Sequence, residues 1–161
     1  MKWLLTLVIF YISSSFAFAQ PEFKKVGEAH MQYLLWDIYD AQLFTLSGHY
    51  KQNTHPVKFT LTYLRDIDAE DIVKATNEQW QHLGKTTLSK KYSSRLLKIW
   101  PNIKEKDTLT LVTSTQGQSF FYFNGKKIGS IEDTEFANDF LAIWLSENTS
   151  EPKLRKQLLG K

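Results

Sequence analysis

An Asn124-Gly125 pair between two alternating apolar segments restricts the possible folds of this chain more than any other feature. A two-residue type I′ turn needs positive φ at both central residues, and Asn-Gly is among the pairs best suited to it. Aromatic side chains fill positions 120–123, and isoleucines return along 128–131. The segment is therefore predicted to be a β-hairpin.

A strongly apolar helix is expected directly after this hairpin. From Phe136 to Leu145, apolar side chains recur at a spacing that places them on a wide stripe of one helix. Asp133 or Thr134 is expected to cap its N-terminus. Such a stripe has to be buried, and the sheet that the hairpin completes is the nearest surface.

The order of the remaining elements defines the fold class. We expect two extended segments over 23–46, a strand over 57–65, helices over 68–83 and 89–100, a strand over 108–115 and a short final helix from about 150. Strands, a helix pair, strands and helices again are typical of an α+β protein rather than of alternating βαβ units. We therefore predict a single α+β domain over 20–161, with a mostly antiparallel sheet and helices packed on one face.

The first nineteen residues have the three parts of a secretory signal peptide. Lys2 is followed by an apolar run from Trp3 to Ile12, and the segment ends in Ala17-Phe18-Ala19. Cleavage after Ala19 would give a periplasmic or secreted protein. The apolar run is shorter than the roughly 20 residues of a spanning helix, so no stable membrane insertion is expected after cleavage.

Composition excludes several classes of function. The chain has 20 basic and 17 acidic side chains, and its lysines are scattered, so no nucleic-acid binding is expected. It contains no cysteine, which rules out disulfides and thiol chemistry. The four histidines lack metal-ligand spacing, and no phosphate loop or nucleophile motif is present. We therefore predict no metal, no cofactor and no catalytic constellation.

An arginine closes the apolar face of the strand predicted over 57–65. Alternate residues from Val57 to Tyr63 are apolar or aromatic, and Arg65 continues the same face. A guanidinium group there is unfavourable unless it is paired or close to solvent. It could anchor the carboxylate of a ligand that lies along the strand. Alternatively, it could form an ion pair with Asp66, Asp68 or Glu70.

Three aromatic side chains are candidate walls of a pocket beside this arginine. Tyr63 precedes it on the same strand face, Tyr39 lies on the second extended segment, and Trp80 lies on the inner face of the helix over 68–83. Each is also compatible with simple burial in the core. We predict Arg65, Tyr63, Tyr39 and Trp80 as ligand-binding residues.

Two pairs of acids could in principle serve general acid–base catalysis. Asp37 and Asp40 are three residues apart, as are Asp68 and Asp71. Such a role needs a pocket and a raised pKa. The first pair is explained by a strand edge or turn and the second by the first turn of a helix, where acids oppose the helix dipole. We therefore predict no catalytic residue.

Four sequence blocks together resemble the chalcone isomerase-like family, and most closely its exported bacterial branch. They are VGEAHMQYLLWDIYDAQLF, YLRDIDAEDIVKA, FFYFNGKKIGSI and FANDFLAIWLSENTSEPKLRKQLL. The resemblance covers nearly all of the chain after residue 19. It implies an antiparallel sheet of six or seven strands, with helices on one face and a ligand cleft between the two layers.

The resemblance implies two kinds of function. Plant members cyclise chalcones and use an arginine on the early strand hairpin, whereas other members resemble fatty-acid-binding proteins that hold a carboxylate with an arginine and a tyrosine. This chain has no arginine before Arg65, and its early segment carries Leu34, Leu35 and Trp36 instead. Chalcone isomerase activity is therefore not expected.

Three hypotheses follow for the function. The first is an exported, non-catalytic protein that binds a small apolar or amphiphilic acid such as a fatty acid. The second is an interaction module that meets another protein of the cell envelope without a small ligand. The third is an isomerase with a relocated site.

Overall fold

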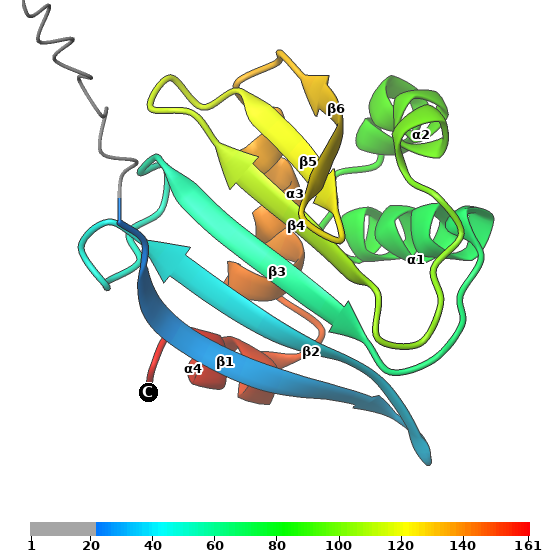
Figure 1. The fold of residues 1–161 in the computed structure, drawn as a ribbon, viewed down its shortest axis with the longest axis horizontal. Helices are drawn as coiled ribbons and strands as arrows, with labels where there is room; N and C mark the ends of the chain where they lie inside the picture. Colours follow the sequence, from blue (N-terminus) through cyan, green and yellow to red (C-terminus); the bar gives the residue numbers. More distant parts are fainter. Residues whose placement is uncertain (1–21) are drawn as a thin grey trace, which may run out of the picture.

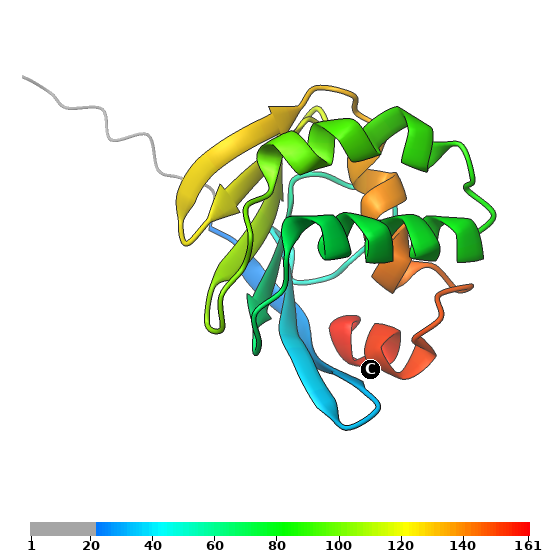
Figure 2. The same ribbon diagram turned by 90° about the vertical axis from the view of Figure 1, so that its right-hand side faces the viewer.

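The computed structural model describes residues 22–161 and shows one six-stranded sheet with helices on a single face (Figures 1 and 2). The signal peptide predicted over 1–19 lies outside the described residues. The strands are β1 (Lys24–Tyr33), β2 (Trp36–Thr45), β3 (Val57–Tyr63), β4 (Thr108–Thr113), β5 (Ser119–Phe123) and β6 (Lys126–Ile131). The helices are α1 (Ala69–His82), α2 (Leu88–Ile99), α3 (Phe136–Leu145) and α4 (Pro152–Leu158).

The strands follow one another across the sheet in the order of the sequence. Every neighbouring pair from β1 to β6 is antiparallel. Helices α1 and α2 lie in the connection between β3 and β4, although these two strands are hydrogen-bonded neighbours. The predicted α+β class, the antiparallel sheet and the helices on one face are confirmed.

The β5–β6 hairpin has the turn that its sequence indicates. Asn124 and Gly125 have φ values of 48° and 80°, as a type I′ turn requires. The Asn124 side chain also accepts a hydrogen bond from the Thr108 backbone N–H at 2.8 Å and donates one to Asp107 at 2.8 Å. One residue therefore shapes the turn and joins it to the start of β4.

The apolar helix α3 forms the centre of the core, where it packs on the sheet and lies beside α1 (Figures 1 and 2). Phe136 and Phe140 stack in parallel on successive turns, with ring centroids 5.5 Å apart. Trp144 continues the stripe and packs against Phe59 of β3 at 4.7 Å. This aromatic stripe joins the two layers, because aromatic pairs stabilise a core beyond the area that they bury.

Helix α4 covers the edge strand β1 at very close range. Gly27 makes this possible, because a Cβ atom at this position would lie 2.2 Å from the carbonyl oxygen of Gln157. Helix α4 therefore extends the helical layer over the edge strand β1 (Figure 2).

Within residues 22–161, no helix combines the length and the apolar character needed to cross a lipid bilayer.

Candidate ligand cavity

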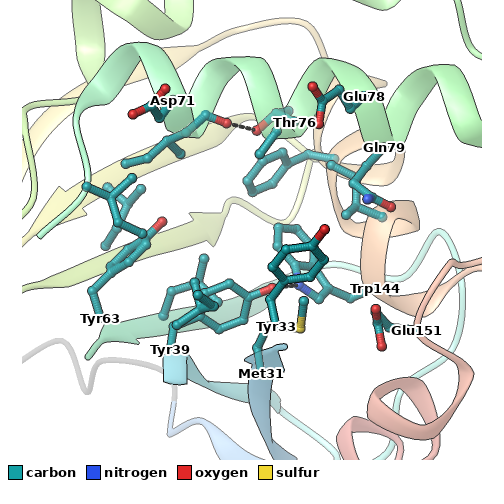
Figure 3. A pocket seen from close by; sticks show the side chains of 18 of the residues that line it. Met31, Tyr33, Tyr39, Tyr63, Asp71, Thr76, Glu78, Gln79, Trp144 and Glu151 are labelled. Carbon is teal, nitrogen blue, oxygen red and sulfur yellow. Dashed lines mark hydrogen bonds between the residues drawn. The ribbon is translucent and has the colours of Figure 1, made fainter. Parts of the chain in front are cut away.

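A cavity of about 400 Å³ lies between the sheet and helices α1 and α3 (Figure 3). Its size falls in the range of small-molecule sites. Strands β1 to β4 form one wall, and α1, α3 and the segment before α4 form the other. The apolar part of the lining consists of Met31, Ile38, Leu61, Ile67, Ile72, Ala75, Trp100, Leu109, Phe140, Ile143 and Trp144.

Two tyrosines on neighbouring strands contribute polar groups to this apolar lining. Tyr39 of β2 and Tyr63 of β3 are directly paired in the ladder, and both point to the helical face. Their rings meet edge to face, with centroids 5.9 Å apart. The register of β2 and β3 therefore places two phenols side by side.

The Tyr39 hydroxyl is bound from the helical layer. The indole Nε1 of Trp144 donates a hydrogen bond to it at 2.9 Å. An indole N–H only donates, so Tyr39 is the acceptor, and its own proton has no acceptor among residues 22–161. Tyr39 as a whole is only partly buried, but its hydroxyl end lies among packed side chains. This burial raises the pKa of Tyr39 to about 12, the Trp144 hydrogen bond opposes the rise, and the nearby Glu151 adds to it.

The Tyr63 hydroxyl has no hydrogen-bond partner among the described residues. The side chain is only 3% exposed, and its hydroxyl is directed from the sheet toward α1 (Figure 3). Burial raises the pKa of Tyr63 strongly, and the neighbouring Tyr39 adds to the shift. Both phenols therefore stay protonated at physiological pH and can donate.

The charged side chains that line the cavity within residues 22–161 are all acidic. Asp71, Glu78 and Glu151 lie at its exposed rim, and no lysine, arginine or histidine of residues 22–161 belongs to the lining. At the same rim, the Ser150 hydroxyl donates to the Gln79 side chain at 2.7 Å and links the segment before α4 to α1.

Arg65 lies outside the cavity. Strand β3 ends at Tyr63, so Arg65 is no longer part of its inward face. The guanidinium group packs over the Trp36 ring at 4.9 Å, beside a shallow depression whose walls Ile38 and Ile67 also line the cavity. No carboxylate of residues 22–161 forms an ion pair with Arg65, and Asp66 pairs with Lys104 instead.

Trp80 is fully buried but faces a different part of the core. Its Nε1 donates to the backbone carbonyl of Asp139 at 3.0 Å, and its ring contacts Tyr92 and Phe136. The structure thus brings Tyr39 and Tyr63 together in the cavity lining and leaves Arg65 and Trp80 out of it. The ligand-binding role of all four residues stays a prediction.

Several lining residues were expected only as core. Phe140, Ile143 and Trp144 belong to the apolar stripe of α3, and their pattern does not separate a packed surface from a cavity wall. The hydrogen bond between Trp144 and Tyr39 spans distant parts of the chain, so no local sequence signal indicates it.

The acids at the start of β2 bind a histidine on the outside of the sheet. His30 lies between Asp40, 2.7 Å from its Nδ1, and Asp37, 2.8 Å from its Nε2. The hydrogen bond to Asp40, followed by that to Asp37, raises the pKa of His30. In the described part of the chain, no group of three or more histidine, aspartate or glutamate side chains is arranged to hold a metal ion.

Comparisons with known proteins agree with this fold. A family model described as chalcone isomerase-like matches residues 34–160. A Haemophilus influenzae protein, described as an uncharacterized protein, is 24% identical over 159 residues, which cover 96% of this chain and 75% of that protein. A crystal structure of a fatty-acid binding protein from Arabidopsis thaliana is similar with a TM-score of 0.61 and 14% identity, over 85% of this chain and 86% of that one.

Proposed function

Because this chain belongs to the chalcone isomerase-like family, we propose that it is a non-catalytic binding protein for a small apolar or amphiphilic molecule. The observation that carries the proposal is the cavity of about 400 Å³, whose lining is mostly aliphatic and aromatic. A preformed apolar cavity with a few polar groups is the usual design of a small-molecule site.

An amphiphilic acid such as a fatty acid is one ligand class that fits these features. The similar Arabidopsis thaliana structure is that of a fatty-acid binding protein, which supports a ligand with an acyl chain. Leu61, Ile143 and Phe140 offer an apolar surface for such a chain.

The polar groups of the cavity favour binding over turnover. Tyr39 and Tyr63 stay protonated, and the three carboxylates of the lining, Asp71, Glu78 and Glu151, are exposed at the rim and not positioned inside the cavity. An isomerase with a relocated site would need a positioned base within reach of its substrate.

Native mass spectrometry of the protein purified without delipidation tests the proposal. We expect a bound mass in the range of an amphiphile, and we expect Ala75→Trp, which places a bulky indole at the exposed α1 rim of the cavity, to reduce or remove it. Lys74→Trp is the matched control, because Lys74 is the adjacent residue of α1 but does not line this cavity. A bare chain mass together with no binding of added amphiphiles would contradict the proposal.

A second candidate, docking to another protein of the cell envelope, is favoured by the β1–β2 turn. Leu34 and Leu35 are 77% and 92% exposed, and Tyr33 and Trp36 beside them are also exposed. A stoichiometric partner that is captured by ligand-free protein, and lost with Leu35→Ser, would support this function instead.

We also propose that the protein is exported to the periplasm or secreted. The support is the sequence pattern of residues 1–19 alone. The intact mass of protein from its native host tests this proposal: a chain that begins at Gln20 is expected, and a chain that retains residues 1–19 would contradict it.

A further inference from the structure

Building on the proposed binding function, we infer that the cavity selects amphiphiles with an uncharged oxygen acceptor and discriminates against ionised carboxylates. The bound end of the ligand is then an ester or ketone carbonyl, an alcohol, or the protonated form of an acid.

Two unused O–H donors point to an oxygen acceptor. Tyr63 has no hydrogen-bond partner among residues 22–161, and the Tyr39 hydroxyl accepts from Trp144 while its own proton has no acceptor. Their rings are 5.9 Å apart on paired strands, and both line the cavity, but the Tyr63 hydroxyl points toward α1 whereas the Tyr39 hydroxyl points to Trp144 of α3 (Figure 3), so each is a separate donor. The Tyr63 hydroxyl oxygen is not enclosed by protein atoms but reaches the open space of the cavity, where the oxygen of a ligand can accept its hydrogen bond.

The charges around the cavity exclude a negative ligand group. The titratable side chains of the lining are Tyr33, Tyr39, Tyr63, Asp71, Glu78 and Glu151. None of them supplies a positive charge, and three are acids. An ionised carboxylate would therefore leave water without a counter-charge and would approach groups of its own sign.

Arg65 borders a depression beside the cavity and does not belong to the cavity lining. Arg65 packs on the exposed Trp36 ring, and it borders the depression that contains Asp66, Asp68 and Asp71. Of these acids, Asp71 also lines the cavity, so the positive charge of Arg65 lies beside the acidic rim and not within the lining. A carboxylate inside the cavity has no basic partner among the residues that line it.

The ionisation of an acid ligand makes this selectivity measurable. An alkyl carboxyl group titrates near pH 4 to 5, so its protonated fraction falls about tenfold for each pH unit above that range. An acid that binds only when protonated must lose apparent affinity at the same rate. An ester of the same chain length carries no such dependence.

The test compares dodecanoic acid, methyl dodecanoate and 1-dodecanol at pH 6, 7.5 and 9, with each ligand below its solubility limit. Binding is followed by the fluorescence change of the cavity tryptophans and by native mass spectrometry. For the ester and for the alcohol, we expect the dissociation constant of each ligand to change by less than about twofold between pH 6 and pH 9. We expect the acid to lose about a thousandfold in affinity from pH 6 to pH 9.

Conservative variants test the role of the hydroxyl. Tyr63→Phe should weaken methyl dodecanoate about fivefold, which corresponds to one hydrogen bond of about 1 kcal/mol. Tyr122→Phe is the matched control, because Tyr122 lies on β5 outside the cavity lining.

The outcomes separate this inference from the proposed function. If the acid binds at pH 9 as tightly as the ester, or if its affinity does not change with pH, the inference is wrong and the binding function stands. If Tyr63→Phe binds the ester as tightly as the unchanged protein does, the Tyr63 hydroxyl does not donate a hydrogen bond to the ligand, and this part of the inference is wrong. If none of the three ligands binds at any pH, the binding function itself is contradicted.

Discussion

The indole N–H of Trp144 donates a 2.9 Å hydrogen bond to the Tyr39 hydroxyl and so joins helix α3 to strand β2 across the cavity. The adjacent Tyr63, on the paired strand, has a hydroxyl without any such partner among residues 22–161. Of the two phenol hydroxyls in the cavity lining, only that of Tyr39 therefore forms a hydrogen bond that can stabilise the folded protein.

Removing these two hydroxyls should have different effects on the free energy of unfolding. Tyr39→Phe leaves the buried N–H of Trp144 without an acceptor and should destabilise the ligand-free protein by about 1 to 3 kcal/mol. Tyr63→Phe breaks no hydrogen bond and should change stability by less than about 0.5 kcal/mol. Urea denaturation of both variants measures the difference, and equal losses would show that the Trp144 hydrogen bond contributes nothing.

Substitution of Gly27 should release helix α4 from the sheet. The Cβ of Gly27→Ala would lie 2.2 and 2.5 Å from the carbonyl oxygens of Gln157 and Leu158, which belong to backbone and cannot rotate away. We expect a loss of about 3 kcal/mol. Gly129→Ala is the comparison, because its Cβ meets only the Ile99 side chain at 2.9 Å and should be about half as damaging. Hydrogen exchange should show early opening of α4 in the first variant alone.

The pKa values of His30 and His55 should lie on opposite sides of the ordinary histidine value of 6.5. Hydrogen bonds to Asp40 and Asp37 raise the pKa of His30, whereas burial lowers that of His55, although Glu135 opposes this shift. An NMR titration of the imidazole signals measures both. Asp40→Asn should lower the pKa of His30 and leave that of His55 unchanged, and a His30 pKa at or below 6.5 would contradict the geometry.

These shifts have opposite consequences for stability. The pKa of His30 is raised on folding, so its contribution is complete below pH 6.5 and is lost as the pH rises through the folded-state pKa. The pKa of His55 is lowered on folding, so the protein loses stability as the pH falls from 6.5 through the folded-state pKa. The variants His30→Gln and His55→Gln should therefore change the pH profile of urea stability in opposite directions.

A positive charge at the rim should improve the binding of an acid ligand. Asp71 lines the cavity from the first turn of α1, is exposed, and forms no ion pair among the described residues. Asp71→Arg replaces a repulsive charge with an attractive one and should raise the affinity for dodecanoate at pH 9 about fivefold, since partly exposed charge pairs contribute about 1 kcal/mol. The affinity for methyl dodecanoate should stay unchanged. A similar gain for the ester would show that charge is not the cause.

Replacing Leu34 in the β1–β2 turn with a residue that favours positive φ should stabilise the protein. Leu34 has a φ of 55° and is 77% exposed, so its side chain gains little packing in an unfavourable conformation. Leu34→Gly should raise the free energy of unfolding by about 1 kcal/mol. Thermal or urea denaturation measures this change, and a loss of stability would mean that Leu34 makes contacts that outweigh the strain.

Local sequence patterns predict the helices and strands of this fold well, but they predict the ends of these elements and the contacts between them poorly. The Asn124-Gly125 turn and the stripe of α3 depend on neighbouring residues, so both could be predicted. The strand predicted over 57–65 ends at Tyr63, and this difference of two residues places Arg65 outside the inward face. Element boundaries are decided by hydrogen bonds to other segments, which the sequence does not display.

The cavity was predictable only in part for the same reason. Alternation along the strand indicates that Tyr63 faces inward, and the ladder places Tyr39 beside it. Trp80 does lie on the inner face of α1, but that face is divided between the cavity and the contact with α3, and Trp80 lies in the second part. Which part a residue occupies depends on the rotation of α1, and periodicity alone does not fix this rotation.

The insertion of α1 and α2 between two adjacent strands separates the residues that build the sheet from many of those that line the cavity. Strands β3 and β4 pair directly, and the Ile67–Ile103 bridge closes the base of the inserted segment, so both helices lie beyond the last pairing of the two strands. Much of the helical wall of the cavity nevertheless comes from α1, within that inserted segment. Substitutions within this one inserted segment can therefore reshape the cavity without altering a residue of the six strands.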